Sequence, residues 1–544
     1  MKLFEATWKD EYNYFERFYN TDTKKSEKRK ITIPHEWYEP SSNGPYTFIL
    51  DETIKLEKKQ GNPKNGRDQY GFLDPMYRNI RDNYWDKNSF NLEPRIWYLD
   101  IETRVGQNST GFPVPNKADE EISLIQIYDN KENVVIMLGS RDWKHQSDYK
   151  LDYKTKYINC KNEYNLIETF LNIFKQLDPL IIYAWNGMGF DFPYIFNRLK
   201  KLNIDTNRLS NYGKAELKEE IWFNDLVFKF KSNGHFWIDF MEVYKTFTFQ
   251  PRPSYALDII AEIEVGEKKV QHSEYAAFDD FYTGKYIIPM NPTKEQLDSK
   301  IYQHAIKFGI DDELKELSHS NFCYYGWKDP LLIKKIDDKL NFSVLMCMIA
   351  EKMGVQIEDS TATLKPWSHF ILNRSYKDNK IMPPRHENPS PNVIGGYVRT
   401  PEIGKHKWVL SADVNSMYPL LGMVGFNMSP ETFVAKGKLP ADLREMILMN
   451  FNNQIEDDRF KIPEEKWERT TNLLKKYNYS LAINGAVFDK SKLGMIPEIV
   501  QNIYNGRKQE KKIMFKYQQR KILIKELLKQ CNSWNQHNRC KKCS

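Results

Sequence analysis

The segment Arg95-Ile96-Trp97-Tyr98-Leu99-Asp100-Ile101-Glu102 decides the fold that we expect for the N-terminal half of this chain. Residues 95–99 form an apolar, aromatic run that predicts a buried strand, and two acids follow it closely. Because residues two apart on a strand point to the same face, Asp100 and Glu102 can aim at one point at the strand's end. On its own, such an acid pair is more often a solvated turn, so the surrounding sequence must decide its meaning.

The residues that follow alternate between strand and helix patterns. Turn residues 130–133 separate two predicted strands, and a helical spacing of apolar residues precedes a third strand and a second helix. The predicted strands are Ile122–Tyr128, Val134–Leu138 and Leu180–Ala184, and the predicted helices are Asn165–Leu177 and Pro193–Leu202. This alternation indicates an α/β domain that extends to about residue 340.

Two further acids extend the first pair. Asp191 follows the strand Leu180–Ala184, in a segment where Gly187 and Gly189 permit a sharp turn and Pro193 suits the first turn of a helix. Asp329 lies four residues after Tyr325, in a segment predicted to precede or open a helix, so that the two side chains share a face. The pairs Asp311-Asp312 and Asp337-Asp338 compete for this place. Neither has a tyrosine at that offset, and we interpret Asp311 and Asp337 as surface charges.

Four carboxylates brought together repel one another unless cations hold them. Mg²⁺ prefers oxygen ligands and keeps waters and substrate oxygens in its coordination shell, and Mn²⁺ can substitute for it. Two such ions flanking a phosphodiester can activate water and stabilise the leaving oxygen. The Tyr325 hydroxyl could orient that water, and Asn186 could hold DNA or a loop nearby.

In their order and spacing, these acids resemble the three exonuclease motifs of the DnaQ-like proofreading domain, in the variant with tyrosine found in family B DNA polymerases. The resemblance implies a ribonuclease H-like fold, and Asp100, Glu102, Asp191 and Asp329 as metal ligands. It implies Tyr325 as the water-orienting residue, and Asn186 and Phe190 as contacts to DNA.

A second site is predicted in Val409-Leu410-Ser411-Ala412-Asp413-Val414-Asn415-Ser416-Met417-Tyr418-Pro419. Trp408–Ala412 predicts an apolar strand that ends in an acid and a turn. The string closely resembles motif A of family B polymerases. The resemblance implies that Asp413 and the Val414 carbonyl bind metal ions and that the backbone at Ser416 and Met417 cradles phosphate. It also implies that Tyr418 excludes a 2′-hydroxyl. Upstream, Gly395-Gly396 resembles the family's DNA-contacting element before the palm.

The C-terminal residues are strongly basic. Residues 501–544 contain twelve Lys and Arg and two acids, a net charge of +10, which leaves −3 for the first 500 residues. Charge alone leaves open whether this is a surface for a polyanion or a solvated helix face. A helical pattern runs from Pro497 to about Lys529 and resembles the first fingers helix of phage family B polymerases. Arg507 and Lys511 share a face there and, by the resemblance, grip the triphosphate of a dNTP.

We therefore expect an α/β multidomain protein, consistent with three or four domains of roughly 150 residues. The expected parts are an N-terminal α+β domain and a ribonuclease H-like exonuclease domain, then a partial palm, a partial helical fingers region and a tail. Their expected ranges are 1–93 with 342–385 returning to it, 94–341, 386–490, 491–530 and 531–544. In the tail, Cys531, His537, Cys540 and Cys543 could form a small zinc site, although an unrelated terminal tail is the simpler interpretation.

Motif B of the family and motif C, which carries the second polymerase carboxylate, are not found in these 544 residues. We expect the N-terminal portion of a phage family B DNA polymerase that needs a C-terminal partner chain with those motifs. Its partners would be primer-template DNA, single-stranded 3′ ends and dNTP, and the resemblance leaves a sliding clamp open. The alternatives are a stand-alone Mg²⁺-dependent 3′→5′ exonuclease and an inactive DNA-binding fragment. Six cysteines and the lack of a long apolar run predict a cytoplasmic protein without a membrane segment or secretory signal.

Overall fold

The computed structural model describes all residues except 62–69, 72, 106–112, 145–149, 223–224, 271, 273–274, 276, 384–398, 413–415, 452–463, 483–484 and 539–544. The chain forms two compact units. The first comprises Met1–Pro34 and Leu73–Asn373, and the second comprises His35–Phe72 and Arg374–Ser544. Within the described residues, no helix combines the length and the apolar character needed to cross a bilayer.

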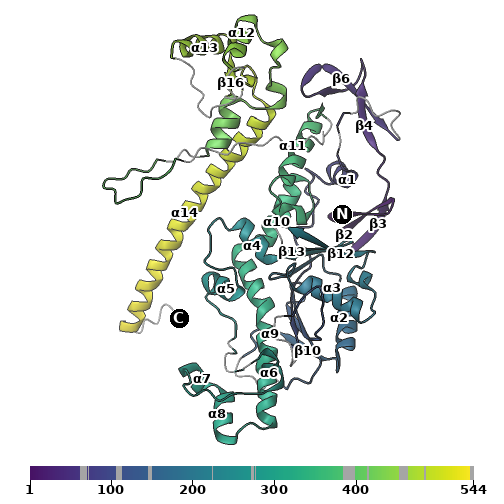
Figure 1. Ribbon diagram of the computed structural model, residues 1–544, viewed down its shortest axis with the longest axis vertical. Helices are drawn as coiled ribbons and strands as arrows, with labels where there is room; N and C mark the ends of the chain where they lie inside the picture. The colour runs from purple at the N-terminus through teal and green to yellow at the C-terminus, as the bar shows by residue number, and fades with distance from the viewer. Residues whose placement is uncertain are drawn as a thin grey trace. The chain divides into compact units, whose positions relative to one another are not determined.

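A six-stranded mixed sheet forms the centre of the first unit (Figure 1). Its strand order is β10-β9-β8-β7-β11-β14, with β8 antiparallel to both β7 and β9 and the remaining pairs parallel. The strands are β7 (Ile96–Thr103), β8 (Ile122–Asp129), β9 (Val134–Gly139), β10 (Thr155–Asn159), β11 (Ile181–Ala184) and β14 (Phe236–Asp239). The strands and the turn predicted between residues 95 and 184 are therefore confirmed to within a few residues at their ends.

Helices cover both faces of this sheet, so its central strands are buried on both sides. On β7, Trp97, Leu99 and Ile101 face a core that includes α2 (Glu163–Leu177) and α3 (Asp191–Lys201). Ile96 and Tyr98 face the opposite core, which includes α4 (Phe240–Phe247), α5 (Leu257–Val265), α9 (Asp312–Leu340) and α10 (Phe342–Met353). The α/β class predicted for this part is confirmed.

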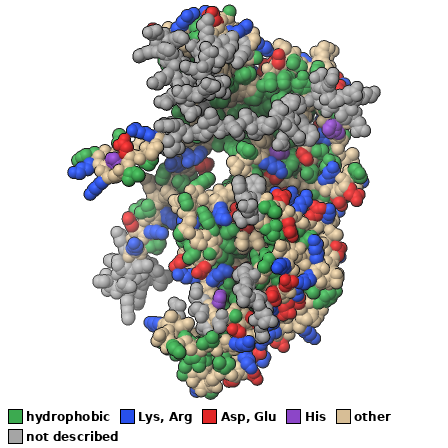
Figure 2. All heavy atoms as spheres, viewed as in Figure 1, with side chains coloured by type: hydrophobic (Ala, Val, Ile, Leu, Met, Phe, Trp, Pro, Cys, Tyr) green, Lys and Arg blue, Asp and Glu red, His purple; other side chains and the backbone are tan. Residues whose placement is uncertain are grey.

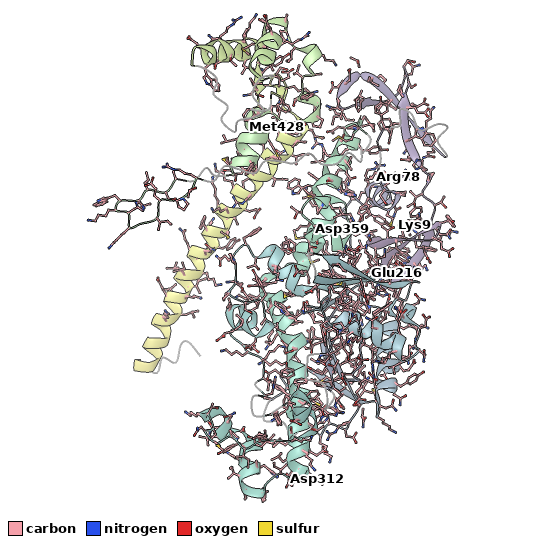
Figure 3. All side chains as sticks on the ribbon, in the orientation of Figure 1. Lys9, Arg78, Glu216, Asp312, Asp359 and Met428 are labelled. Carbon is pink, nitrogen blue, oxygen red and sulfur yellow. The ribbon has the colours of Figure 1, made fainter. Side chains whose placement is uncertain are left out.

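Helix α9 differs from the prediction. We expected Tyr325–Asp329 to precede or open a helix, but these residues lie in the middle of the 29-residue helix α9. Asp312, labelled in Figure 3, is its first residue. The helix continues through Gly326 and Pro330, which commonly interrupt helices, because residues on both sides of them are buried against the sheet.

The rest of the first unit surrounds this three-layer core. An antiparallel sheet is formed by β1 (Lys2–Asp10), β2 (Asn13–Asn20) and β3 (Lys25–Ile31), and a hairpin by β12 (Ala215–Trp222) and β13 (Asp225–Ser232). The other helical segments are α1 (Pro75–Asn83), η1 (Thr206–Leu209), α6 (Phe278–Thr283), α7 (Lys294–Asp298), α8 (Lys300–Phe308) and η2 (Ile357–Thr361). The apolar pattern of Phe342–Met353 predicts a helix, and α10 has these bounds.

The second unit contains two small sheets and several helices. One sheet has the order β15-β5-β6-β4, from β4 (Glu36–Pro40), β5 (Tyr46–Phe48), β6 (Asp51–Gln60) and β15 (Lys380–Ile381). The other pairs β16 (Tyr479–Leu481) with β17 (Val487–Asp489), and the sequence of residues 478–488 is typical of such a hairpin. The helical segments are η3 (Met417–Gly425), η4 (Pro430–Thr432), η5 (Lys436–Lys438), α12 (Ala441–Phe451), α13 (Glu464–Tyr477) and α14 (Met495–Asn538), and α11 (Lys365–Lys377) crosses the boundary between the units.

Two local predictions in the second unit are wrong. Trp408–Ala412 is not a strand: Trp408 adopts a left-handed backbone conformation, and Trp408, Val409 and Leu410 are exposed. An apolar strand needs a neighbour to satisfy its backbone, and none of the described strands pairs with this segment. Lys58–Arg67 is a polar stretch that predicts a loop, but Lys58–Gln60 belong to β6, and residues 62–67 lie outside the described residues.

Candidate active site

Strand β7 and helix α9 bring three of the predicted acids together. Asp100, Glu102 and Asp329 each offer one carboxylate oxygen, and these oxygens lie within 4.8 Å of one another. Asp100 and Glu102 share the face of β7 on which α9 packs, which is the arrangement that their two-residue spacing predicts. Glu102 and Asp329 are buried, so water does not screen their mutual repulsion well.

Asp191 reaches the same cavity from the first turn of α3. The turn that precedes it differs from the prediction, because the left-handed residue is Asn186, with φ of 60°, and neither glycine has a positive φ. The glycines instead provide space: a Cβ at Gly187 would lie 2.7 Å from the Phe192 ring, and one at Gly189 would lie 2.5 Å from the Asn186 side chain. Asp239 accepts hydrogen bonds from the backbone N–H groups of Asn186 (3.1 Å) and Met188 (3.3 Å), which fixes the turn.

These acids line a cavity of about 610 Å³. Tyr325 lies in its wall, with its ring edge-on to those of His272 and Phe278. The predicted DNA contacts Asn186 and Phe190 line it too. The other lining residues are Ile101, Thr103, Val105, Pro113, Trp185, Lys269 and Ala277.

The electrostatics of the site favour neutral carboxyl groups in the absence of a cation. Burial raises the pKa of Asp191 to about 8. Burial, with added repulsion from neighbouring carboxylates, also raises the pKa values of Asp100 and Glu102 well above their ordinary range. Burial raises the pKa of Asp329, although Lys269 opposes this rise.

Lys269 is a member of the site that the sequence analysis missed. Its ammonium group forms an ion pair with Asp329 and lies 5.4 Å from the centre of the Tyr325 ring. The neighbouring carboxylates outweigh burial and raise the pKa of Lys269 well above its ordinary value. No pattern in Glu267-Lys268-Lys269-Val270 distinguishes this lysine from the surface lysines around it, so only the fold reveals it.

The residues present fit divalent cations. Four acids face one lysine, so the cavity carries excess negative charge whenever the acids are ionised. The Oδ1 atom of Asp329 is buried and has no hydrogen-bond partner among the described residues. An all-oxygen set of ligands with an unused buried lone pair suits Mg²⁺ or Mn²⁺.

The competing acids on α9 do not enter this cluster. Asp311 caps the N-terminus of α9 and contacts His304, and it is partly exposed. The interpretation of Asp337 as a surface charge is wrong. Asp337 is buried and accepts a hydrogen bond of 2.6 Å from the Tyr98 hydroxyl and another of 2.9 Å from the Ser343 backbone N–H.

The predicted polymerase residues lie in the second unit. Asp413, Val414, Gly395 and Gly396 lie outside the described residues, as do the side chains of the predicted zinc ligands. Ser416 has a φ of 54° and precedes η3, on which Met417 and Tyr418 are exposed. Arg507 and Lys511 lie one turn apart on α14, and both are exposed.

The first unit thus has an α/β fold with an acidic cavity whose carboxylates could hold divalent cations, and the chain has a second compact unit, so it belongs to the class of multidomain α/β proteins with a candidate metal site. A sequence model of the exonuclease domain of DNA polymerase family B matches residues 75–260, and one of DNA polymerase family B matches residues 362–530. Together they match more than half of the chain. The chain belongs to DNA polymerase family B.

Individual relatives agree with this assignment. The chain is 27% identical to the DNA-directed DNA polymerase of Escherichia phage RB69 over 459 residues, which cover 80% of this chain and 44% of the relative. It is 23% identical to the DNA-directed DNA polymerase of Enterobacteria phage T4 over 488 residues, which cover 85% and 47%. A DNA polymerase of Pyrococcus horikoshii is 24% identical over 286 residues, which cover 51% and 20%. The chain thus spans less than half the length of each of these relatives.

Proposed function

We propose that the first unit is a 3′→5′ exonuclease that removes nucleotides from single-stranded DNA ends with Mg²⁺ as its cofactor. The observation that carries this proposal is the convergence of Asp100, Glu102 and Asp329 within 4.8 Å, in a cavity that Asp191 also lines. The sheet order β9-β8-β7-β11-β14, with only β8 reversed, supports a ribonuclease H-like fold for residues 94–341.

Each residue of the cavity has a chemical task in this proposal. Asp100, Glu102, Asp191 and Asp329 hold the cations, which when bound supply Lewis acidity to the attacked phosphate. Tyr325 orients the attacking water through its hydroxyl, and Lys269 holds Asp329 in place and offsets part of its charge. Asn186 and Phe190 contact the terminal nucleotides, the first through its amide and the second by stacking.

The substitution Asp191→Ala tests this assignment. The variant should lose degradation of a 5′-labelled single-stranded oligonucleotide with either Mg²⁺ or Mn²⁺, because one of the cation-binding carboxylates is gone. Asp338→Ala is the matched control, since Asp338 lies on α9 but pairs with Lys334 at the surface, and it should retain activity. Unchanged degradation by the Asp191 variant would rule out the assigned site.

We propose further that the second unit contributes part of a DNA polymerase site that acts on primer-template DNA and dNTP. The match of residues 362–530 to the family supports this proposal. Asp413 and the Val414 carbonyl hold cations, Ser416 and Met417 bind phosphate, and Tyr418 excludes a 2′-hydroxyl. Arg507 and Lys511 grip the triphosphate, and Gly395 and Gly396 contact DNA. A two-ion polymerase site needs a second carboxylate, so synthesis requires residues that these 544 do not contain.

Primer extension with added polypeptide tests this second proposal. The 544 residues alone should not extend a primer, whereas a polypeptide that carries motifs B and C should restore extension when joined or mixed. Asp413→Ala should abolish the restored activity. Exonuclease activity without any restored synthesis would favour a stand-alone exonuclease, and salt-sensitive DNA binding without either activity would favour a DNA-binding fragment.

A further inference from the structure

A buried amide lies directly behind the acidic cluster. Gln126 is fully buried on β8, in register with Asp100 on the neighbouring strand β7. Its Nε2 atom donates a hydrogen bond of 2.6 Å to Oδ2 of Asp100. One of the predicted cation ligands is therefore held by a side chain that does not itself line the cavity.

An amide at this position is an uncommon choice for the core. The neighbouring residues of β8 include Leu124, Ile125 and Ile127, and all of them are buried and apolar. The Oε1 atom of Gln126 is buried and has no hydrogen-bond partner among the described residues. A buried amide with half of its polar atoms unpaired costs free energy, so packing alone does not explain Gln126.

Helix α9 leaves room for this amide. Gly326 packs over β8, and a Cβ there would lie 2.8 Å from Nε2 of Gln126. Gly326 directly follows Tyr325 and comes three residues before Asp329. Helix α9 thus comes close to the sheet beside the hydrogen bond that joins Gln126 on β8 to Asp100 on β7.

We propose that Gln126 is a positioning residue for divalent cations, which fixes the rotation of the Asp100 carboxylate so that it, Glu102 and Asp329 face one point. This inference rests on the proposed exonuclease function. Carboxylates that bind metal ions are commonly held by such outer hydrogen bonds, and the loss of one typically costs 10- to 100-fold in metal affinity. Gln126 holds the ligand in its binding orientation and takes no part in the reaction itself.

The test of this role is the binding of Mn²⁺ alone to the full chain. Electron paramagnetic resonance measures this binding. Gln126→Met keeps the length and unbranched shape of the side chain but removes the donor. We expect Mn²⁺ affinity to fall by about tenfold or more at the sites that Asp100→Ala abolishes. The thermal midpoint of the metal-free protein should change little, because the unpaired Oε1 atom disappears together with the hydrogen bond.

Tyr128→Phe is the matched control. Tyr128 lies two residues further along the same face of β8, and its hydroxyl donates to Asn133, away from the acids. This variant should bind Mn²⁺ like the unaltered chain. Gln126→Asn provides a second test, because it keeps the amide but withdraws the donor by one methylene, and it should also lose affinity.

Two results would overturn the inference. In the first, the Gln126→Met and Gln126→Asn variants bind Mn²⁺ with an affinity within twofold of the unaltered chain. In the second, Tyr128→Phe loses as much Mn²⁺ affinity as the Gln126 variants do. Failure of the proposed function would look different, since the chain would then bind Mn²⁺ in a Gln126-dependent manner but would not degrade DNA.

Discussion

The buried carboxyl group of Asp191 lowers the stability of the metal-free protein, and bound cations would offset this cost. It is buried in a cavity with three other acids, and its pKa is raised to about 8. Without a cation, Asp191 must either be ionised in a poorly solvated place or take up a proton that it would not hold in the unfolded chain. Both states cost free energy at pH 8. Function is the physical reason to keep four acids together, because an apolar or amide side chain would suit the folded protein better.

We expect Asp191→Asn to stabilise the metal-free protein at pH 8 and to abolish the proposed exonuclease activity. The folded-state pKa of Asp191, about 8, exceeds its ordinary value of 3.8, so ionisation opposes folding increasingly as pH rises from 4 to 8. Asparagine avoids this cost, which is on the order of a few kcal/mol. Thermal midpoints in a chelator should therefore differ most at pH 8 and converge as pH falls toward 4.

Asp205→Asn serves as the control for this prediction, because Asp205 caps η1 at the surface of the same unit. A thermal midpoint for Asp191→Asn that lies below that of the unaltered chain at pH 8 would contradict the raised pKa.

Removal of Lys269 should have the opposite effect on stability. Lys269→Met removes the ammonium group that pairs with the buried Asp329 carboxylate. Because the Lys269 side chain is 27% exposed, solvent weakens this pair, and we expect the free energy of unfolding to fall by roughly 1–3 kcal/mol. Urea unfolding with and without Mn²⁺ would measure this loss, and the metal should recover much of it. Lys268→Met is the control, since Lys268 pairs with Glu262 at the surface. If adding Asp329→Asn to Lys269→Met fails to restore stability, the pairing is not the cause.

At the scale of the element, helix α9 sets the geometry of the site. Tyr98 lies on the same face of β7 as Asp100 and Glu102, and Asp337 lies two turns after Asp329 on α9. The hydrogen bond between Tyr98 and Asp337 therefore fixes the register of α9 on the strand. The Ser343 hydroxyl and backbone N–H also donate to Asp337, which links the start of α10 to the same point.

Asp337 and Asp338 provide a matched pair for testing this link. Asp337→Ala removes the acceptor for the buried Tyr98 hydroxyl and should cost about 2–4 kcal/mol in urea unfolding. Asp338→Ala removes only a surface ion pair with Lys334 and should cost at most about 1 kcal/mol. Equal effects of the two substitutions would show that Asp337 does not hold the register.

The elements that the sequence predicts well are those whose local pattern and burial agree. Strands β7, β8, β9 and β11 and helices α2, α3 and α10 are continuous apolar or amphipathic runs bounded by turn residues. Helix α9 was missed in part because its burial changes along 29 residues and because it contains Gly326 and Pro330. The prediction for Asp337 is wrong for a related reason: a charged sequence neighbourhood indicates exposure, and its buried partner Tyr98 lies on a distant strand.

At the candidate site, spacing predicted the acids but not their supports. Asp100 and Glu102 could be paired from strand periodicity, and Asp191 and Asp329 from their resemblance to motifs. Lys269 and Gln126 are joined to these acids only through contacts between distant segments, so no local rule reveals them. A single buried amide in the apolar run of β8 is the one sequence signal that could have drawn attention to Gln126.

At the scale of the whole molecule, basic residues are concentrated in helix α14 of the second unit. Acidic and basic side chains are interspersed over the face of the first unit seen in Figure 2. Helix α14 of the second unit contains nine Lys and Arg but two Glu between residues 501 and 529, and its side chains from Arg507 to Lys529 are exposed. Because these basic side chains are exposed, a polyanion such as the phosphates of DNA or dNTP could reach them, and the salt dependence of DNA binding distinguishes such a surface from a solvated helix face.

Neutralising part of α14 should weaken DNA binding and its dependence on salt. For single-stranded DNA, each phosphate contact contributes about 0.7 to the slope of log affinity against log salt concentration. The variant changes four lysines of α14 to Gln, namely Lys508, Lys512, Lys516 and Lys521. Its slope should be smaller by up to about 2.8. Fluorescence anisotropy of a labelled oligonucleotide at several salt concentrations would measure this. The rate of hydrolysis at saturating DNA should stay the same, because every residue of the acidic cavity belongs to the first unit.

The matched control changes four exposed, uncharged side chains of the same helix, Gln501, Gln509, Gln518 and Gln519, to Ala. This variant alters the surface of α14 to a similar extent but leaves its charge intact, so its salt slope should equal that of the unaltered chain. If the lysine variant also keeps the full slope, the basic residues of α14 form a solvated face and the positive charge that meets DNA must lie elsewhere.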